Sequence, residues 1–107
     1  MARARVYRLV YDPKALDHVR AIHRKFHSMI RDRIKGQLSR QPNVETRNRK
    51  PLSRPSWIAP AWELRFGPDN RFRVFYRVDE GASVVQVLAV GEKKGNVLSV
   101  GGKEFRV

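Results

Sequence analysis

Apolar and polar residues alternate at the start of the chain. Residues 5–11 mix arginines with β-branched and aromatic side chains, and the run stops at Asp12-Pro13. A period of two predicts a strand. Asp accepts hydrogen bonds from free backbone N–H groups and Pro fits a first helical turn, so this dipeptide favours a helix start. The sequence therefore predicts a strand over 5–11 followed directly by a helix.

The period then changes to three and four residues between Lys14 and about Arg40. The apolar positions that follow this spacing are Leu16, Val19, Ile22, Phe26, Met29, Ile30, Ile34 and Leu38. Such a stripe is typical of an amphipathic helix. We expect one long helix, or two helices separated near His23-Arg24. The opposite face is basic; a solvated surface is the simpler interpretation, and a phosphate-lining surface is the alternative.

Residues 41–60 show no period and contain four prolines. They also carry a basic cluster at Arg47, Arg49, Lys50 and Arg54. A loop of this length in a small domain is usually functional or mobile. We expect either a connector from helix to sheet or a loop that contacts nucleic acid.

The period returns to two from Ala61 onward. It predicts strands over 61–66 and 71–78, joined by a turn at Gly67-Pro68-Asp69-Asn70. After a turn at residues 79–81, residues 83–90 are apolar on both faces except at Gln86, which predicts a central strand covered on both sides. We expect residues 91–96 to end that strand, and residues 97–100 to add a short one.

These elements predict a single α+β domain over residues 1–107. Its antiparallel sheet has about four strands and is packed on one face by one long or two N-terminal helices. If the apolar side chains of the strands face the helices, a set of charged residues faces away from them: Glu63, Arg65, Arg71, Arg73 and Arg77, with Lys93 and Lys94 beyond the next strand. Clustered cations stabilise developing charge on a phosphoryl group. The alternative is an exposed face on which Glu63 pairs with arginines across strands.

Charge strengthens the expectation of an anionic partner. The chain carries 23 Lys and Arg against 10 Asp and Glu, a formal net charge of +13. Such an excess favours binding to a polyanion. Cysteine is absent, which excludes thiolate chemistry and disulfides. No apolar run is long enough to span a membrane, so we expect a cytoplasmic protein without a membrane partner.

Three segments carry a family resemblance: Trp62-Glu63-Leu64-Arg65-Phe66-Gly67, then Arg71-Phe72-Arg73-Val74-Phe75-Tyr76-Arg77-Val78-Asp79, then Val87-Leu88-Ala89-Val90-Gly91-Glu92-Lys93-Lys94-Gly95-Asn96. In order and spacing they resemble the RelE/ParE toxins of bacterial type II toxin–antitoxin systems. The resemblance implies the RelE-like (microbial RNase-like) fold and a small antitoxin partner, which we expect to be acidic in its toxin-binding segment.

The resemblance also implies two activities for the superfamily. RelE-like members cleave mRNA on the ribosome with a cluster of Lys and Arg, while ParE-like members inhibit DNA gyrase. By position, Arg65, Arg73 and Lys93 match the basic sites of the nucleases. We therefore expect a metal-independent, ribosome-dependent mRNA endoribonuclease without a cofactor, with the ribosome and mRNA as partners. Inhibition of gyrase, or RNA binding without catalysis, is the alternative.

Two departures from the nuclease pattern affect the expected mechanism. Glu63 stands where a basic residue is expected, and no Tyr follows Tyr76. Glu63 is therefore a candidate general base, with Lys93 or Lys94 as the acid. Six further cations are candidate RNA contacts: Arg71, Arg77, Arg47, Arg49, Lys50 and Arg54.

The histidines are not expected to act in catalysis. His23 and His27 stand four residues apart on the predicted helix, and two histidines without a third ligand are an incomplete zinc site. His18 has no obvious partner in the sequence. We expect ordinary packing roles for all three and no metal site.

Overall fold

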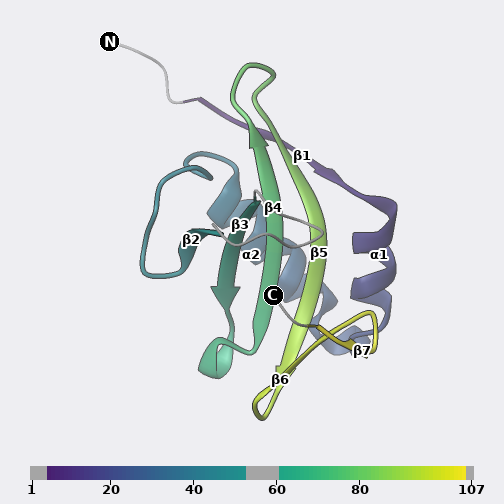
Figure 1. The fold of residues 1–107 in the computed structure, drawn as a ribbon. Helices are drawn as coiled ribbons and strands as arrows, with labels where there is room; N and C mark the ends of the chain where they lie inside the picture. The colour runs from purple at the N-terminus through teal and green to yellow at the C-terminus, as the bar shows by residue number, and fades with distance from the viewer. Residues whose placement is uncertain (1–4, 53–60, 106–107) are drawn as a thin grey trace.

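The computed structural model of the 107-residue chain describes residues 5–52 and 61–105. Two helices lie on one face of a single sheet (Figure 1). The helical elements are α1 (Pro13–Arg20), the short 3₁₀ helix η1 (Arg24–Phe26), α2 (His27–Leu38) and the 3₁₀ turn η2 (Pro68–Asn70). The strands are β1 (Arg8–Tyr11), β2 (Arg49–Leu52), β3 (Ala61–Phe66), β4 (Phe72–Asp79), β5 (Val84–Lys94), β6 (Val97–Val100) and β7 (Lys103–Glu104).

The predicted helix start at Asp12-Pro13 is confirmed. The Asp12 carboxylate accepts a hydrogen bond from the backbone N–H of Lys14 at 2.9 Å. The helical region is divided, as the second alternative had it, because α1 ends at Arg20 and α2 begins at His27. Two histidines stabilise the break between them. His23 accepts a hydrogen bond from the N–H of Lys25, and the His27 ring lies 2.7 Å from the carbonyl of Ile22.

The sheet is larger than predicted. Within residues 5–52 and 61–105, its seven strands run in the order β2-β3-β4-β5-β6-β7, with β1 pairing to β5 off this path. The β1–β5 pair is parallel and all others are antiparallel. The expectation of about four antiparallel strands is therefore wrong in number, and wrong in orientation for β1, while the α+β class is confirmed.

Two boundaries differ from the sequence prediction. Strand β2 lies inside the stretch predicted to be irregular; it contains Pro51, which lacks a backbone N–H and is tolerated because β2 is an edge strand. Strand β5 continues through Lys94, where a break was expected, and the turn comes at Gly95-Asn96. Residues 93 and 94 are thus held by pairing with β6.

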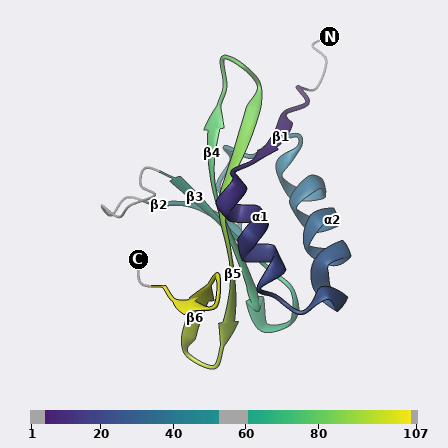
Figure 2. The ribbon, with the colours of Figure 1, turned by 90° about the vertical axis from the view of Figure 1, so that its right-hand side faces the viewer.

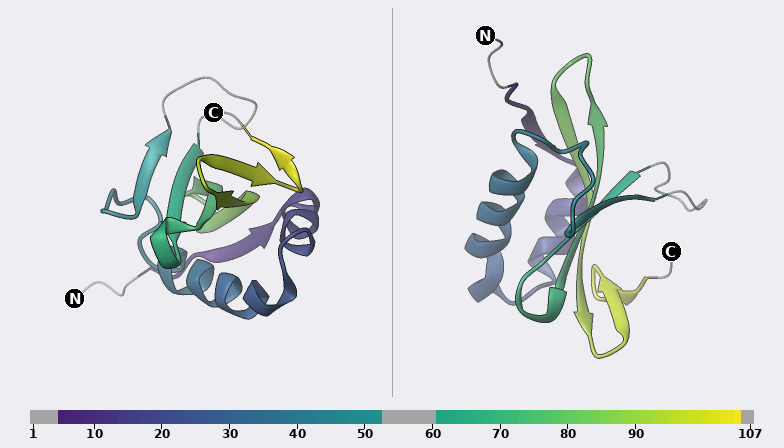
Figure 3. Two further views of the ribbon diagram at one scale, coloured as in Figure 1. Left: turned by 90° about the horizontal axis from the view of Figure 1, so that it is seen from below. Right: turned by 90° about the vertical axis from the view of Figure 1, so that its left-hand side faces the viewer.

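Apolar side chains fill both faces of the sheet. On the helix side, Ile30 and Ile34 of α2 pack with Leu64, Val74 and other strand residues in the larger core. Figure 2 shows the helices on one side of the sheet, with the β6–β7 end of the chain on the other. Figure 3 shows the same layering from two further directions.

A smaller core lies on the face opposite the helices, which we call the open face. It contains Ala61, Phe75, Leu88, Ala89 and Val100. Phe105 packs against Phe75 with ring centres 5.1 Å apart. The C-terminal residues therefore cover part of the open face.

A β-bulge shifts the alternation of side chains along β5, which contributes to the cores on both faces of the sheet. Phe75 pairs with Ala89, but the next residue, Tyr76, pairs with Val87, so Leu88 is an extra residue in β5. The bulge places consecutive residues Leu88 and Ala89 in the smaller core. The prediction of a central strand covered on both faces is confirmed.

Within the described residues, no helix has the length and apolar character needed to cross a bilayer.

Candidate active site

Three cations from three adjacent strands converge on the carboxylate of Glu63. The Arg65 Nε donates to Glu63 Oε1 at 2.8 Å, and the Lys50 Nζ lies 4.0 Å from the same oxygen. On the other side, Arg73 Nη1 lies 4.0 Å from Glu63 Oε2. We call Lys50, Glu63, Arg65 and Arg73 the Glu63 cluster; β2, β3 and β4 together position it on the open face.

The sheet register brings these four residues together. Lys50 of β2 pairs directly with Glu63 of β3, and Arg65 of β3 pairs directly with Arg73 of β4. Residues 63 and 65 share one face because side chains alternate along a strand. The geometry therefore shows only part of the alternative interpretation: Glu63 pairs with Arg65 of its own strand and lies near Arg73 of β4, but it is buried and does not lie on an exposed face.

Burial makes the electrostatics of the cluster strong. Glu63 is 4% exposed and Arg73 is 9% exposed. Burial, followed by repulsion from the Arg65 guanidinium, lowers the pKa of Arg73, while the Glu63 carboxylate opposes this shift. A partly desolvated arginine beside a second one is a favourable place for an added anion.

The two candidate lysines lie at the end of β5, in a different place from the carboxylate. Lys93 pairs with Leu98 of β6, two residues beyond the Gly91–Arg73 pair, and so lies on the open face. A groove of about 520 Å³ at this end of the sheet is lined by Pro68, Asp69, Arg71, Lys93, Lys94 and Gly95. The structure thus separates the predicted catalytic set into the Glu63 cluster and a lysine-rich groove.

Arg71 does not face away from the helices, contrary to the sequence prediction. Its Nη2 lies 2.6 Å from Glu92 Oε2, and its guanidinium lies 4.6 Å from the ring centre of Phe26 in η1. The reason is that β4 begins at Phe72, so the alternation of a strand does not extend to Arg71, which has helical backbone angles. Its backbone carbonyl accepts a hydrogen bond from the N–H of Lys93 at 2.7 Å.

The predicted RNA-contacting cations of the loop have different environments. Arg49 is 7% exposed, and its Nη1 donates to the Gln37 carbonyl near the end of α2 at 2.6 Å. It therefore joins β2 to the helix layer. Lys50 belongs to the Glu63 cluster, and Arg47 is exposed just before β2. Arg54 lies outside the described residues.

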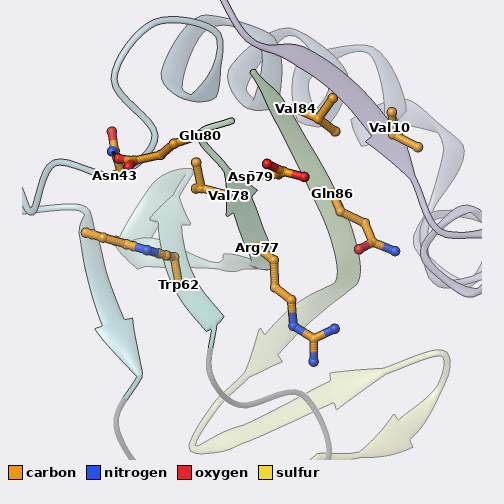
Figure 4. A pocket seen from close by; sticks show the side chains of 9 residues that line it. All are labelled: Val10, Asn43, Trp62, Arg77, Val78, Asp79, Glu80, Val84 and Gln86. Atoms are coloured by element: carbon orange, nitrogen blue, oxygen red, sulfur yellow. Dashed lines mark hydrogen bonds between the residues drawn. The ribbon is translucent and has the colours of Figure 1, made fainter. Parts of the chain in front are cut away.

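Arg77 lies in a third place, at the far end of the sheet from the groove. It lines a pocket of about 720 Å³ (Figure 4). The other residues of the pocket are Val10, Asn43, Trp62, Val78, Asp79, Glu80, Val84 and Gln86. Asp79 and Glu80 offset the charge of Arg77, so this pocket is not a basic one.

His18 has a partner that the sequence did not indicate. Its Nδ1 accepts a hydrogen bond from the backbone N–H of Val90 at 3.3 Å, and burial lowers its pKa. Among the described residues, no three His, Asp or Glu side chains gather as metal ligands would.

Sequence reasoning placed Lys50 among the RNA contacts and missed its position beside Glu63. The segment Arg49-Lys50-Pro51-Leu52 carries no alternation that would have indicated a strand, and Pro51 is disfavoured in one. Pairing of β2 with β3 could not be inferred without knowing that this segment forms the sheet edge.

Comparisons with known proteins agree with this architecture. The family model of the ParE toxin of type II toxin–antitoxin systems, parDE, matches residues 6–97. The toxin–antitoxin complex RelBE2 of Mycobacterium tuberculosis contains a chain with a TM-score of 0.70 and 24% identity, over 87% of this chain and 98% of that one. A double-arginine mutant of the Escherichia coli toxin RelE in the free state gives a TM-score of 0.60 and 18% identity, over 81% and 83%. No curated protein matches the chain.

At 24% and 18% identity, the two solved structures show the fold alone. The family model covers both helices and the strands of the Glu63 cluster. The order and spacing of the quoted segments lead to the same superfamily. The chain is therefore a RelE/ParE superfamily toxin of a type II toxin–antitoxin system.

Proposed function

We propose that this toxin is a metal-independent endoribonuclease that cleaves mRNA on the ribosome in the cytoplasm and is neutralised by an antitoxin. The observation that carries the proposal is the convergence of Lys50, Arg65 and Arg73 on one point of the open face. Three cations held by paired strands form a rigid site for a phosphodiester. The net charge of +13 suits an environment of ribosomal RNA.

Each residue has a distinct part in the proposed reaction. The 2′-oxygen of a ribose attacks the adjacent phosphorus as the 2′-hydroxyl proton passes to a solvent water, and the bond from phosphorus to the 5′-oxygen breaks, which leaves a 2′,3′-cyclic phosphate. Arg65 and Arg73 stabilise the additional negative charge on the phosphoryl oxygens. Lys93 stands two residues along β5 from Gly91, the partner of Arg73, and from this position on the open face it donates a proton to the departing 5′-oxygen. Lys94 and Arg71 line the groove in which the RNA continues.

The antitoxin is the second partner in this proposal. One of the structural relatives is a toxin–antitoxin complex. A protein of charge +13 fits a partner whose toxin-binding segment is acidic.

Expression in a bacterial host, with mapping of new RNA 5′ ends, tests the reaction. We expect growth arrest and cuts inside translated messages with the wild-type chain, and loss of both with Arg73→Ala. Arg20→Ala removes an exposed arginine paired with Asp17 on α1 and is the matched control. Arrest without cuts would contradict the nuclease.

Inhibition of DNA gyrase is the second candidate, favoured by the matched family model, which is that of the ParE toxin. It predicts arrest with intact messages and an induced DNA-damage response. RNA binding without catalysis predicts no arrest at all. The same expression experiment therefore separates all three functions.

A further inference from the structure

Glu63 is an anion in the centre of a site that is otherwise made of cations. Its Oε1 contacts Arg65 and Lys50, and its Oε2 is nearest to Arg73. Both carboxylate oxygens therefore have cationic neighbours, as two oxygens of a bound phosphate would. The side chain is 6% exposed, so water offers little competing solvation.

The three contacts differ in strength. Arg65 makes a direct hydrogen bond at 2.8 Å, whereas Lys50 and Arg73 stand at 4.0 Å, beyond hydrogen-bond distance. Arg73 instead donates its Nε to the carbonyl of Asn70 at 3.2 Å. Of the three cations, Arg65 alone therefore makes a short hydrogen bond to Glu63.

The charges explain why a carboxylate is needed here in the absence of RNA. Arg65 and Arg73 pair directly across β3 and β4, and like charges directly opposite each other destabilise a sheet. Glu63 relieves this repulsion. The same carboxylate also occupies the position that attracts a phosphate.

We propose that Glu63 is an internal counter-ion that gates the site, and that an RNA phosphodiester binds by displacing its carboxylate from Arg65 and Arg73. This inference rests on the proposed function, because it takes the ligand to be RNA. It gives Glu63 a role different from that of a general base. The competition weakens binding of isolated RNA, so productive binding draws on further contacts with the message or the ribosome.

Affinity for an uncleavable RNA tests the gate. The probe is a fluorescent oligonucleotide with 2′-O-methyl riboses, which lack the attacking hydroxyl, and binding is followed by anisotropy. We expect Glu63→Gln to bind about tenfold more tightly than the wild type, because one charge-assisted competitor is removed. Adding Arg73→Ala to Glu63→Gln should abolish the gain.

Asp17→Asn is the matched control for net charge. Asp17 is exposed on α1, on the helix side of the sheet, and its loss changes the total charge by the same amount. We expect its affinity to stay within about twofold of the wild type. Unchanged or weaker binding by Glu63→Gln, or an equal gain with Asp17→Asn, would overturn the gate.

A second measurement tests the proposal even when Glu63→Gln is less stable than the wild type. Inorganic phosphate should raise the melting temperature of this variant more than that of the wild type, since a ligand stabilises the state that binds it. An equal or smaller rise would contradict the proposal. This comparison needs only the folded fraction of each protein.

Cleavage is measured separately, in a translation extract with defined mRNA. The gate predicts that Glu63→Gln cleaves with a lower KM for the message than the wild type, whereas the general-base hypothesis predicts that kcat is lost. If wild type and variant both leave mRNA intact while the variant binds the oligonucleotide more tightly, the nuclease proposal fails and the gate remains. The two proposals can therefore fail independently.

Discussion

His18 accepts a hydrogen bond from the backbone N–H of Val90 through Nδ1, a contact that requires this nitrogen to be unprotonated. The ring thereby links α1 to β5, beside the turn at Gly101. Burial is the main cause that lowers its pKa, and Asp17 and Asp12 oppose this shift. The His18 side chain thus joins the helix layer to β5, the strand that carries Lys93.

A pH dependence of stability follows from His18. Because its pKa is lower in the folded state, the unfolded chain binds the proton more tightly, and protonation favours unfolding. The stability contributed by neutral His18 is present above its ordinary pKa of 6.5 and is lost as the pH falls from there toward the folded-state pKa. We expect the melting temperature of the wild type to fall more than that of His18→Gln between about pH 7.5 and about pH 5. Equal falls in the two proteins would refute this role.

Tyr76 makes the second prediction at this scale. Its buried hydroxyl donates to the carbonyl of Pro42 at 2.6 Å, and burial raises its pKa. Tyr76→Phe keeps the ring that stacks on Trp62 but leaves the carbonyl without this donor. We expect the free energy of unfolding in urea to fall by about 1–3 kcal/mol. An unchanged midpoint would show that water replaces the donor without cost.

At the scale of elements, the site depends on how closely the strands approach one another. Gly91 of β5 pairs with Arg73 on one side and with Val100 of β6 on the other. A Cβ atom at Gly91 would lie 3.0 Å from Leu98 Cδ1, Ser99 O and Val100 Cγ2. The absence of a side chain at this position therefore lets β6 close the smaller core beside the Glu63 cluster.

Gly91→Ala should separate β6 from β5. The added methyl group forces at least one close neighbour to shift, and the backbone oxygen of Ser99 cannot rotate away, so we expect a loss of about 1–3 kcal/mol in chemical denaturation. Gly36→Ala is the control, because Gly36 is exposed in α2 with no atom near its added Cβ. That variant should gain about 0.5–1 kcal/mol from reduced freedom of the unfolded chain. A similar loss at both positions would contradict the packing argument.

The whole molecule has an uneven distribution of charge. Residues 1–60 carry 15 basic and 4 acidic side chains, whereas residues 61–107 carry 8 and 6. The Glu63 cluster draws on both parts, since Lys50 comes from the first and the other three residues come from the second. The general positive charge attracts a polyanion, and the cluster provides specific contacts for it.

Salt dependence separates these two contributions. Affinity for single-stranded RNA falls with salt in proportion to the number of phosphates contacted. We expect Arg73→Ala to reduce the slope of log affinity against log salt by about 0.7, the value for one lost phosphate contact. Arg20→Ala, on the helix side of the sheet, should leave the slope unchanged. Equal slopes in all three proteins would show that Arg73 contacts no phosphate.

The amino-acid sequence was sufficient for the local features of this fold. The cap at Asp12, the hairpin of β3 and β4 and the α+β class all follow from period, caps and turn residues, which act between near neighbours in the chain, whereas the break near His23 was one of two alternatives. The candidate residues Arg65 and Arg73 could be selected in the same way, because alternation places both on one face.

Only the tertiary structure decided which charges meet. Pro51 concealed an edge strand, so the pairing of Lys50 with Glu63 depended on strand order. The backbone of Arg71 leaves the strand conformation and turns its charge toward Phe26, while Arg49 is buried against the end of α2. Pairing between distant segments depends on register and packing over the whole sheet, whereas periodicity records only which residues share a face.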